Sequence, residues 1–214
     1  MSVRTILVLN PKGGCGKTTL AVNIACFYAN QGKSVVLADF DSQGSGLEWL
    51  QARSEKYPPI EGIPAWKSGQ RLPKDVDYLI MDAPAAVHGK EVTGLIKHAQ
   101  SVIMPVLPSP IDIRAAAHFI HDILLNGKVS RNETKLAVVA NRVRENTIVY
   151  HKLQQFLKRL EIPFIATLRD TQNYIRAADR GIGIFEMAPS MVGHDIEQWK
   201  SLTRWLNSKR SLPG

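Results

Sequence analysis

The stretch Asn10-Pro11-Lys12-Gly13-Gly14-Cys15-Gly16-Lys17-Thr18-Thr19 decides how this chain folds. The apolar run Thr5–Leu9 precedes it and predicts a strand. A helix is predicted behind it, because apolar residues recur there at helical spacing: Leu20, Ile24, Phe27 and Tyr28. A strand, a glycine-rich turn and a helix start together form an anion-binding nest of backbone N–H groups. The stretch therefore predicts a loop that binds the phosphates of a nucleotide.

Two lysines in this loop have different expected partners. Lys17 is placed to reach the β- and γ-phosphates, and the Thr18 hydroxyl to sit on Mg²⁺. The usual pattern of such loops has glycine at position 11, where this chain has Pro11, and a second lysine follows at position 12. Lys12 comes too early to duplicate the Lys17 contact. One place for its charge is the phosphate of a nucleotide held by another subunit.

Lys12–Thr19 resembles the deviant Walker A loop of the ParA/MinD ATPases. The resemblance implies a P-loop NTPase fold, ATP and Mg²⁺ as ligands, and a homodimer joined by ATP. In such a dimer Lys12 acts as a catalytic residue across the subunit boundary, and an adaptor protein stimulates a slow ATPase activity. The implied nucleotide-binding residues are Lys12, Gly13, Gly14, Cys15, Gly16, Lys17, Thr18, Thr19 and Asn141.

Strand-like and helical stretches alternate along the rest of the chain. Further strands are expected at Val35–Asp41, Asp77–Asp82, Ser101–Leu107, Lys135–Asn141 and Phe164–Leu168. Helices are expected at Gly46–Ser54, Lys90–Ala99, Ile111–Leu125 and Ile148–Leu160, and a proline-broken connection at Tyr57–Pro73. This alternation predicts one α/β domain over residues 1–214. We expect a doubly wound, mostly parallel sheet with helices on both faces.

Acidic side chains stand at the carboxyl ends of two predicted strands, where functional groups of such sheets gather. Asp39 and Asp41 belong to a segment that resembles the family's switch segment; the resemblance assigns Asp41 to orienting the attacking water and leaves Asp39 structural. Asp82 resembles the family's Walker B acid and is expected to bind Mg²⁺ with Thr18. The alternative for all three acids is that they only form turns.

Asn141 is the last residue of the strand predicted at Lys135–Asn141. An amide pairs with both the donor and the acceptor edge of adenine, and by resemblance Asn141 reads the base. A turn-forming asparagine is the alternative. The loop Pro105–Asp112 is either a dimer-face loop, as in the family, or a plain helix start.

Basic residues outnumber acidic ones by eight, and five of those excess charges fall in residues 142–214. A basic surface fits a polyanionic partner, so nonspecific binding to DNA phosphates is expected. A solvated basic face is the alternative. The candidate DNA-binding residues are Arg169, Arg176, Arg180, Lys200, Arg204, Lys209 and Arg210.

The last segment carries an apolar stripe of Ile196, Trp199, Leu202, Trp205 and Leu206. We expect this stripe to pack on the sheet, although MinD-type proteins end in an amphipathic membrane helix. No signal peptide or membrane span is expected. The two cysteines, Cys15 and Cys26, indicate a reducing cytoplasm.

These features predict an ATP-dependent dimerising switch that is cytoplasmic and nucleoid-associated, binds DNA nonspecifically, and is reset by hydrolysis. Its cargo is a plasmid, a chromosome or a protein organelle such as a carboxysome. The chain resembles the short ParA class without a helix-turn-helix, and residues 166–174 resemble the carboxysome-positioning McdA proteins. The alternatives are a MinD-like membrane-associated division regulator and a metabolic ATPase or ligase on the same fold.

Overall fold

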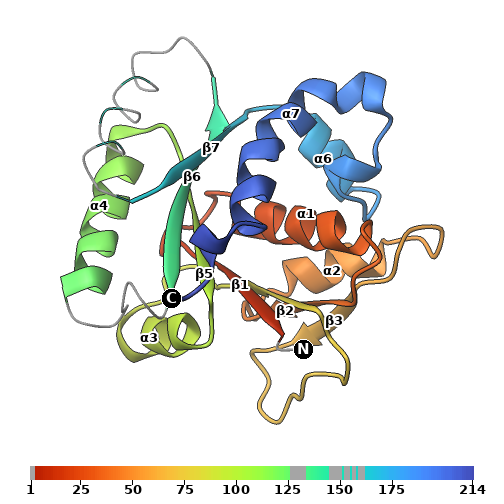
Figure 1. The fold of residues 1–214 in the computed structure, drawn as a ribbon, viewed down its shortest axis with the longest axis horizontal. Helices are drawn as coiled ribbons and strands as arrows, with labels where there is room; N and C mark the ends of the chain where they lie inside the picture. Colours follow the sequence, from red (N-terminus) through yellow and green to blue (C-terminus); the bar gives the residue numbers. More distant parts are fainter. Residues whose placement is uncertain (1–2, 126–133, 145–150, 152–154, 156–157, 159–161) are drawn as a thin grey trace.

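The computed structural model describes residues 3–125, 134–144, 151, 155, 158 and 162–214. Seven strands form one parallel sheet in the order β3-β2-β4-β1-β5-β6-β7 (Figure 1). The strands are β1 (Arg4–Val8), β2 (Val35–Asp39), β3 (Glu61–Pro64), β4 (Tyr78–Asp82), β5 (Ser101–Val106), β6 (Lys135–Val143) and β7 (Phe164–Arg169). The predicted α/β fold is confirmed, and every pairing is parallel.

Helices cover both faces of the sheet. The first face packs against α1 (Lys17–Ala29), α2 (Ser45–Gln51), α6 (Asn173–Ala178), the short helix η1 (Ile184–Glu186) and α7 (Pro189–Leu206). The second face packs against α3 (Gly89–Lys97) and α4 (Pro110–Leu125). Figure 1 shows α1 and α7 on one side of the strands and α3 and α4 on the other.

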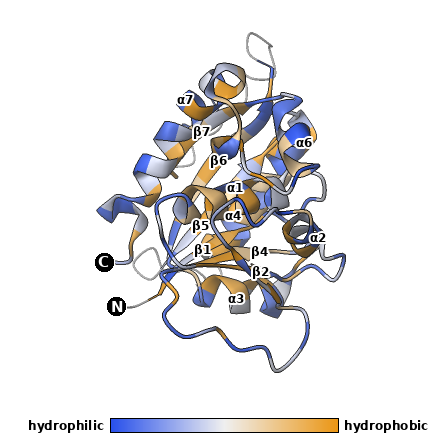
Figure 2. Ribbon diagram, turned by 90° about the vertical axis from the view of Figure 1, so that its right-hand side faces the viewer, coloured by the Kyte–Doolittle hydropathy of each residue, from blue (hydrophilic) through white to orange (hydrophobic). Residues whose placement is uncertain are grey.

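The strand sequences explain why both faces are covered. In β1, Ile6 and Val8 join the core under α1, while Leu7 and Leu9, which directly follows the strand, join the core under α3. All five residues of β2 are buried. A strand with apolar side chains on both faces would expose one apolar face to solvent if helices covered only the other. Helices therefore pack against both faces of the sheet. Figure 2 shows the same distribution, with hydrophobic colour on the central strands and hydrophilic colour on the loops.

The structure corrects two of the predicted secondary-structure elements, and a third lies mainly outside the residues that the structure describes. The stretch Tyr57–Pro73 contains an edge strand, β3, which pairs with β2. Strand β2 ends at Asp39 and not at Asp41, because the Asp39 carboxylate accepts the N–H groups of Asp41 and Gly46 and turns the chain. The helix predicted at Ile148–Leu160 falls mainly outside the described residues.

The C-terminal stripe packs into the core, as predicted. Trp199 and Leu202 of α7 have no exposed surface, and the Trp199 indole N–H donates to the Tyr174 hydroxyl at 2.8 Å. After α7 the turn η2 (Lys209–Ser211) returns to the amino ends of the strands, where Arg4 donates to the Ser211 carbonyl at 3.0 Å. None of the described helices is long and apolar enough to cross a membrane.

Candidate nucleotide site

The loop between β1 and α1 lies at the carboxyl edge of the sheet, and hydrogen bonds of the Asn10 side chain fix its conformation. Asn10 donates to the Pro105 carbonyl at 2.6 Å and accepts the Lys12 N–H at 2.9 Å. Gly14 and Gly16 have left-handed φ values of 72° and 91°. Gly16 precedes α1 without a side-chain cap, so the first N–H groups of the helix stay available to an anion.

Lys17 and Lys12 point to different places. Lys17 is buried, lines the pocket in front of the loop, and donates to the Lys12 carbonyl at 3.0 Å. The Lys12 side chain does not line that pocket; it is 39% exposed and forms an ion pair with Asp112 at 2.9 Å. Asp112 belongs to the first turn of α4, the segment that the sequence left open between a dimer-face loop and a helix start.

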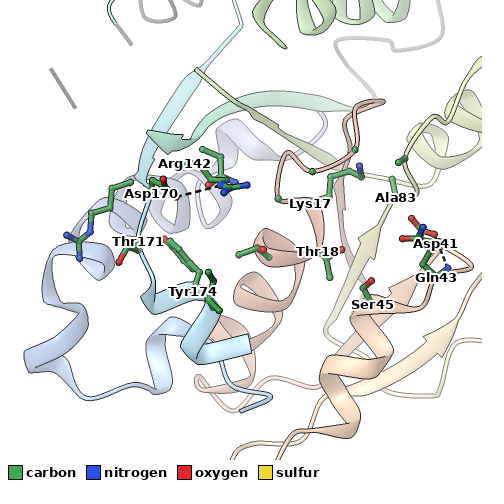
Figure 3. Close-up of a pocket in the computed structure, with 18 residues that line it drawn as sticks. Lys17, Thr18, Asp41, Gln43, Ser45, Ala83, Arg142, Asp170, Thr171 and Tyr174 are labelled. Carbon is green, nitrogen blue, oxygen red and sulfur yellow. Dashed lines mark hydrogen bonds and ion pairs between the residues drawn. The ribbon is translucent and has the colours of Figure 1, made fainter. Parts of the chain in front are cut away.

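The pocket has a volume of about 550 Å³, enough for a nucleotide. Figure 3 shows its two sides: Lys17 and Thr18 with Asp41, which follows β2, and opposite them Arg142, Asp170 and Tyr174. Of the predicted nucleotide-binding residues, those that line it are Gly13, Gly14, Gly16, Lys17, Thr18, Thr19 and Asn141. Cys15 is buried behind the loop, and its thiol donates to the Lys12 carbonyl at 3.3 Å.

The three acids differ in what they bind. Asp39 is buried, and both its oxygens accept backbone N–H groups, which agrees with a structural role. Asp41 lines the pocket and accepts the Gln43 N–H at 3.0 Å. Asp82 is 1% exposed, and its Oδ1 has no hydrogen-bond partner among the described residues.

Asp82 fits a Mg²⁺ site. Burial raises its pKa to about 7, although the hydrogen bond from Thr18 opposes that shift. An unpartnered buried carboxylate oxygen beside a threonine hydroxyl is the donor pair that Mg²⁺ takes when nucleotide phosphates complete its shell. Within the described ranges no group of three or more His, Cys, Asp or Glu side chains could hold a metal. A Mg²⁺ ion here would depend on the phosphates.

Asn141 ends the straight part of β6 beneath the loop. It is 4% exposed and donates to the Cys15 carbonyl at 2.8 Å. One of its two amide hydrogens is used in this way, which leaves the other hydrogen and the carbonyl oxygen for a base. A Cβ on residue 16 would lie 2.3 Å from this amide nitrogen, so the position of Asn141 requires glycine at residue 16.

Sequence reasoning missed most of the pocket wall opposite the loop. Arg142 has a left-handed φ of 53° within a β-bulge and forms an ion pair with Asp170 at 3.6 Å. Asp170, Thr171 and Tyr174 follow β7. Their signal in the sequence is only their position after a strand, since a bulge and a left-handed arginine have no local pattern.

The predicted DNA-binding residues do not all have free side chains. Arg169 lines the nucleotide pocket and forms an ion pair with buried Asp195. Lys200 pairs with Glu197 on the surface of α7. The other candidates have exposed positions along α6, the segment after it, α7 and η2: Arg176, Arg180, Arg204, Lys209 and Arg210.

A nucleotide-sized pocket at the carboxyl edge of a parallel sheet, fronted by a glycine-rich loop and a helix start, defines a P-loop nucleotide-binding protein. Residues 6–184 match the CobQ/CobB/MinD/ParA nucleotide binding domain. The chain belongs to that family.

One protein of similar sequence and two solved structures of similar fold illustrate the relatives of this chain. The chain is 27% identical over 192 residues to maintenance of carboxysome distribution protein A of Halothiobacillus neapolitanus, covering 86% of this chain and 87% of that protein. Its fold matches apo McdA of Cyanothece with a TM-score of 0.77 and 17% identity, over 96% of this chain and 100% of that one. It also matches cobyrinic acid a,c-diamide synthase of Mycobacterium smegmatis, solved with an ATP analogue and magnesium, with a TM-score of 0.69 and 20% identity over 99% and 98% of the two chains.

Proposed function

We propose that this chain is an ATPase that positions a protein organelle of the carboxysome type on the nucleoid. ATP and Mg²⁺ occupy the 550 Å³ pocket and join two subunits. The joined dimer binds DNA nonspecifically, and ATP hydrolysis, stimulated by an adaptor protein, releases it. Similarity to carboxysome distribution protein A over most of both chains supports this choice among the activities of the family.

One observation carries the dimer proposal: the Lys12 ammonium lies outside its own nucleotide pocket and is 39% exposed. A cation at that place neutralises no phosphate of its own subunit. A second subunit that brings its nucleotide against this surface offers the ammonium group a phosphate in place of Asp112, and Lys12 then acts as a catalytic residue in trans.

The proposed chemistry uses few groups, because phosphoryl transfer needs positioning and charge neutralisation. Lys17 holds the transferred phosphoryl group, and Thr18 and Asp82 hold Mg²⁺, which neutralises charge on the phosphates when bound. Asp41, which lines the pocket, orients the attacking water. Asn141 recognises the base.

DNA binding is proposed from the exposed arginines and lysines of the last third of the chain. A dimer that contacts six to eight phosphates should show a log–log slope of affinity against salt of roughly −5 to −7. These contacts require no base reading, which suits a protein that moves over the whole nucleoid.

The test measures dimerisation and DNA binding together. Light scattering should give a dimer for the wild type with ATP and Mg²⁺ and a monomer with ADP. Lys12→Ala should stay monomeric while it retains ATP, and Lys17→Ala should lose ATP itself. If DNA gel shifts were the same with ATP, with ADP and without nucleotide, the switch would be refuted.

A MinD-like membrane function is disfavoured by one observation. The apolar stripe of α7 is buried against β7, so it has no apolar face to offer a bilayer. Flotation with anionic liposomes and ATP distinguishes the two functions, and we expect the protein to stay in the dense fraction.

A further inference from the structure

A second cavity adjoins the nucleotide pocket where α1, α2 and α6 come together. It has a volume of about 190 Å³, and Figure 1 shows α1 between α6 and α2. The cavity and the nucleotide pocket share four lining residues: Thr18, Thr19, Ser45 and Tyr174. In Figure 3, three of them, Tyr174, Thr18 and Ser45, lie along the lower side of the nucleotide pocket. A molecule in the second cavity would therefore lie against the bound nucleotide.

The walls of this cavity are partly apolar and partly polar, and they are uncharged. Val22, Ala178 and Ile182 supply the apolar part, and the polar part includes Thr19 and Trp49. Among the described residues that line the cavity, none has an ionised side chain. An ion would lose its hydration here without gaining a counter-charge, which is unfavourable. The cavity therefore favours an uncharged ligand.

Trp49 supplies an unused hydrogen-bond donor. It is 6% exposed, and its indole N–H has no partner among the described residues. A buried donor without an acceptor is unfavourable, and the great majority of buried donors in proteins have one. Because Trp49 lines the cavity, an acceptor bound there can satisfy this N–H. The unused donor therefore predicts a ligand with a carbonyl or similar oxygen.

The Trp49 ring is held in place before any ligand arrives. The Arg53 guanidinium lies over the ring, 5.4 Å from its centroid, and buried Glu186 holds that guanidinium in turn. The neighbouring amide of Asn23 is already engaged, since it donates to the Thr19 carbonyl at 2.8 Å and accepts the Ile184 N–H at 2.7 Å. The donor is thus preorganised, which lowers the cost of binding a ligand.

The size of the cavity favours a small molecule over water alone. The volume of 190 Å³ equals that of about six water molecules. A buried water needs two to four polar partners, and waters beside Val22, Ala178 and Ile182 would find few. An apolar group displaces such weakly held waters with a gain in affinity.

We propose that this cavity is a second ligand site, which binds a small uncharged molecule with an apolar ring and one carbonyl oxygen. The oxygen accepts the Trp49 N–H, and the ring packs on Val22, Ala178 and Ile182. The ligand raises the affinity for the nucleotide because each buries surface of the other, and the nucleotide raises the affinity for the ligand by the same factor. This inference goes beyond the proposed function, since it requires a bound nucleotide but neither a dimer nor DNA.

The experiment follows the indole N–H signals of the full chain by NMR while 2-piperidone, a lactam with one carbonyl oxygen, is added. Trp49→Phe identifies the Trp49 signal by its loss. We expect the Trp49 proton to move downfield, with a Kd on the order of 1 mM for a probe of this size. Trp205 is the internal control, because its buried N–H also lacks a partner among the described residues but does not line the cavity; its signal should stay in place.

Two matched comparisons test the chemistry and the place. Piperidine has the same ring but is a cation without a carbonyl, so it should leave the Trp49 signal unchanged. Ala178→Leu narrows the cavity and should weaken 2-piperidone binding about tenfold or more. Ala52→Leu makes the same change outside the cavity lining and should bind the lactam like the wild type. Both alanines are exposed, so both variants should fold.

Calorimetry measures the coupling to the nucleotide. Saturating 2-piperidone should raise the affinity for ATP at least about twofold in the wild type and leave that of Ala178→Leu unchanged. If the lactam binds in this way but ATP promotes neither dimerisation nor DNA binding, the proposed function fails and the second site stands.

Four results would overturn the second site. The first is a Trp49 proton that does not move at up to about fifty times the expected Kd. The second is an equal movement of the Trp49 and Trp205 protons. The third is equal lactam binding by the wild type and Ala178→Leu. The fourth is an affinity for ATP that saturating lactam leaves unchanged.

Discussion

Replacing Glu186 by alanine should destabilise the protein strongly, because it leaves the buried Arg53 guanidinium with backbone carbonyl acceptors but without its carboxylate partner. The Arg53 guanidinium donates to the two Glu186 oxygens at 2.8 and 2.5 Å, and their side chains are only 5% and 2% exposed. Glu186 also accepts the Gly183 N–H at 2.8 Å and the Asn30 amide at 3.1 Å. Together these bonds join the end of α2, α1 and η1 into one unit.

The size of the effect follows from burial. Removing one partner of a buried ion pair costs about 3–5 kcal/mol, since the other charge stays in a poorly solvating site. For a domain of this length 1 kcal/mol corresponds to roughly 2–4 °C in Tm, so Glu186→Ala should lower Tm by about 6–20 °C. The double variant Arg53→Met/Glu186→Ala leaves no buried charge, and it should lose roughly 1–3 kcal/mol less than the sum of Arg53→Met and Glu186→Ala.

The assay is thermal and urea unfolding followed by tryptophan fluorescence, with the four variants of the cycle compared at one pH. Glu197→Ala is the control, because its pair with Lys200 lies on the surface and is worth about 1 kcal/mol or less. A Tm loss for Glu186→Ala no larger than that of the control would refute the reasoning, as would strict additivity of the two single variants.

Three further outcomes are expected. Burial raises the pKa of Asp82 in the folded protein to about 7, so the stability of the wild type should fall as pH rises from about 4 to 7. Asp82→Asn should remove that pH dependence and raise Tm at pH 8 without Mg²⁺, as measured by thermal melting. The same variant should bind Mg²⁺ more weakly in a titration. Gly16→Ala should abolish nucleotide binding in a fluorescent-analogue assay, because the φ of residue 16 is 91° and the new methyl group would clash with Asn141. At Gly14 no atom lies within 4 Å of an added methyl group, so Gly14→Ala should cost only about 1–2 kcal/mol of backbone strain. Trp199→Ala should destabilise by about 3–5 kcal/mol in urea unfolding, since the side chain is fully buried; a loss under about 1 kcal/mol would mean that α7 does not depend on docking.

Those parts of the fold that have a local pattern could be predicted from the sequence. The phosphate loop has its glycines and lysines in one stretch, and each strand before an acid is a run of buried apolar residues. Strand β3 could not be predicted, because Glu61–Pro64 is short, lies at the edge, and contributes a single buried apolar side chain, Ile63. Its glycine is required by packing, since a side chain on Gly62 would lie within 2.8 Å of both Leu47 and Leu50 of α2.

Site residues could be predicted from the sequence only where they lie together in one continuous segment, as in the phosphate loop. Lys12 was assigned to a partner subunit from its place in the loop, but its ion pair with Asp112 joins residues far apart in the chain. Arg142 and Tyr174 reach the pocket through a β-bulge and a helix after β7, and neither has a sequence signal. Arg169 looked like a surface cation, although buried Asp195 binds it beside the pocket.

The bond between Arg4 and the Ser211 carbonyl joins residues 207 positions apart and sets a limit on folding during synthesis. A ribosome adds about 5–20 residues each second, so β1 waits roughly 10–40 s for the turn that secures its amino end. Until α7 has been made, β7 lacks the helix that packs against it. The nascent chain therefore completes this part of its core only after residue 211 has been made, and so long-range a contact predicts that the last folding step is late and slow.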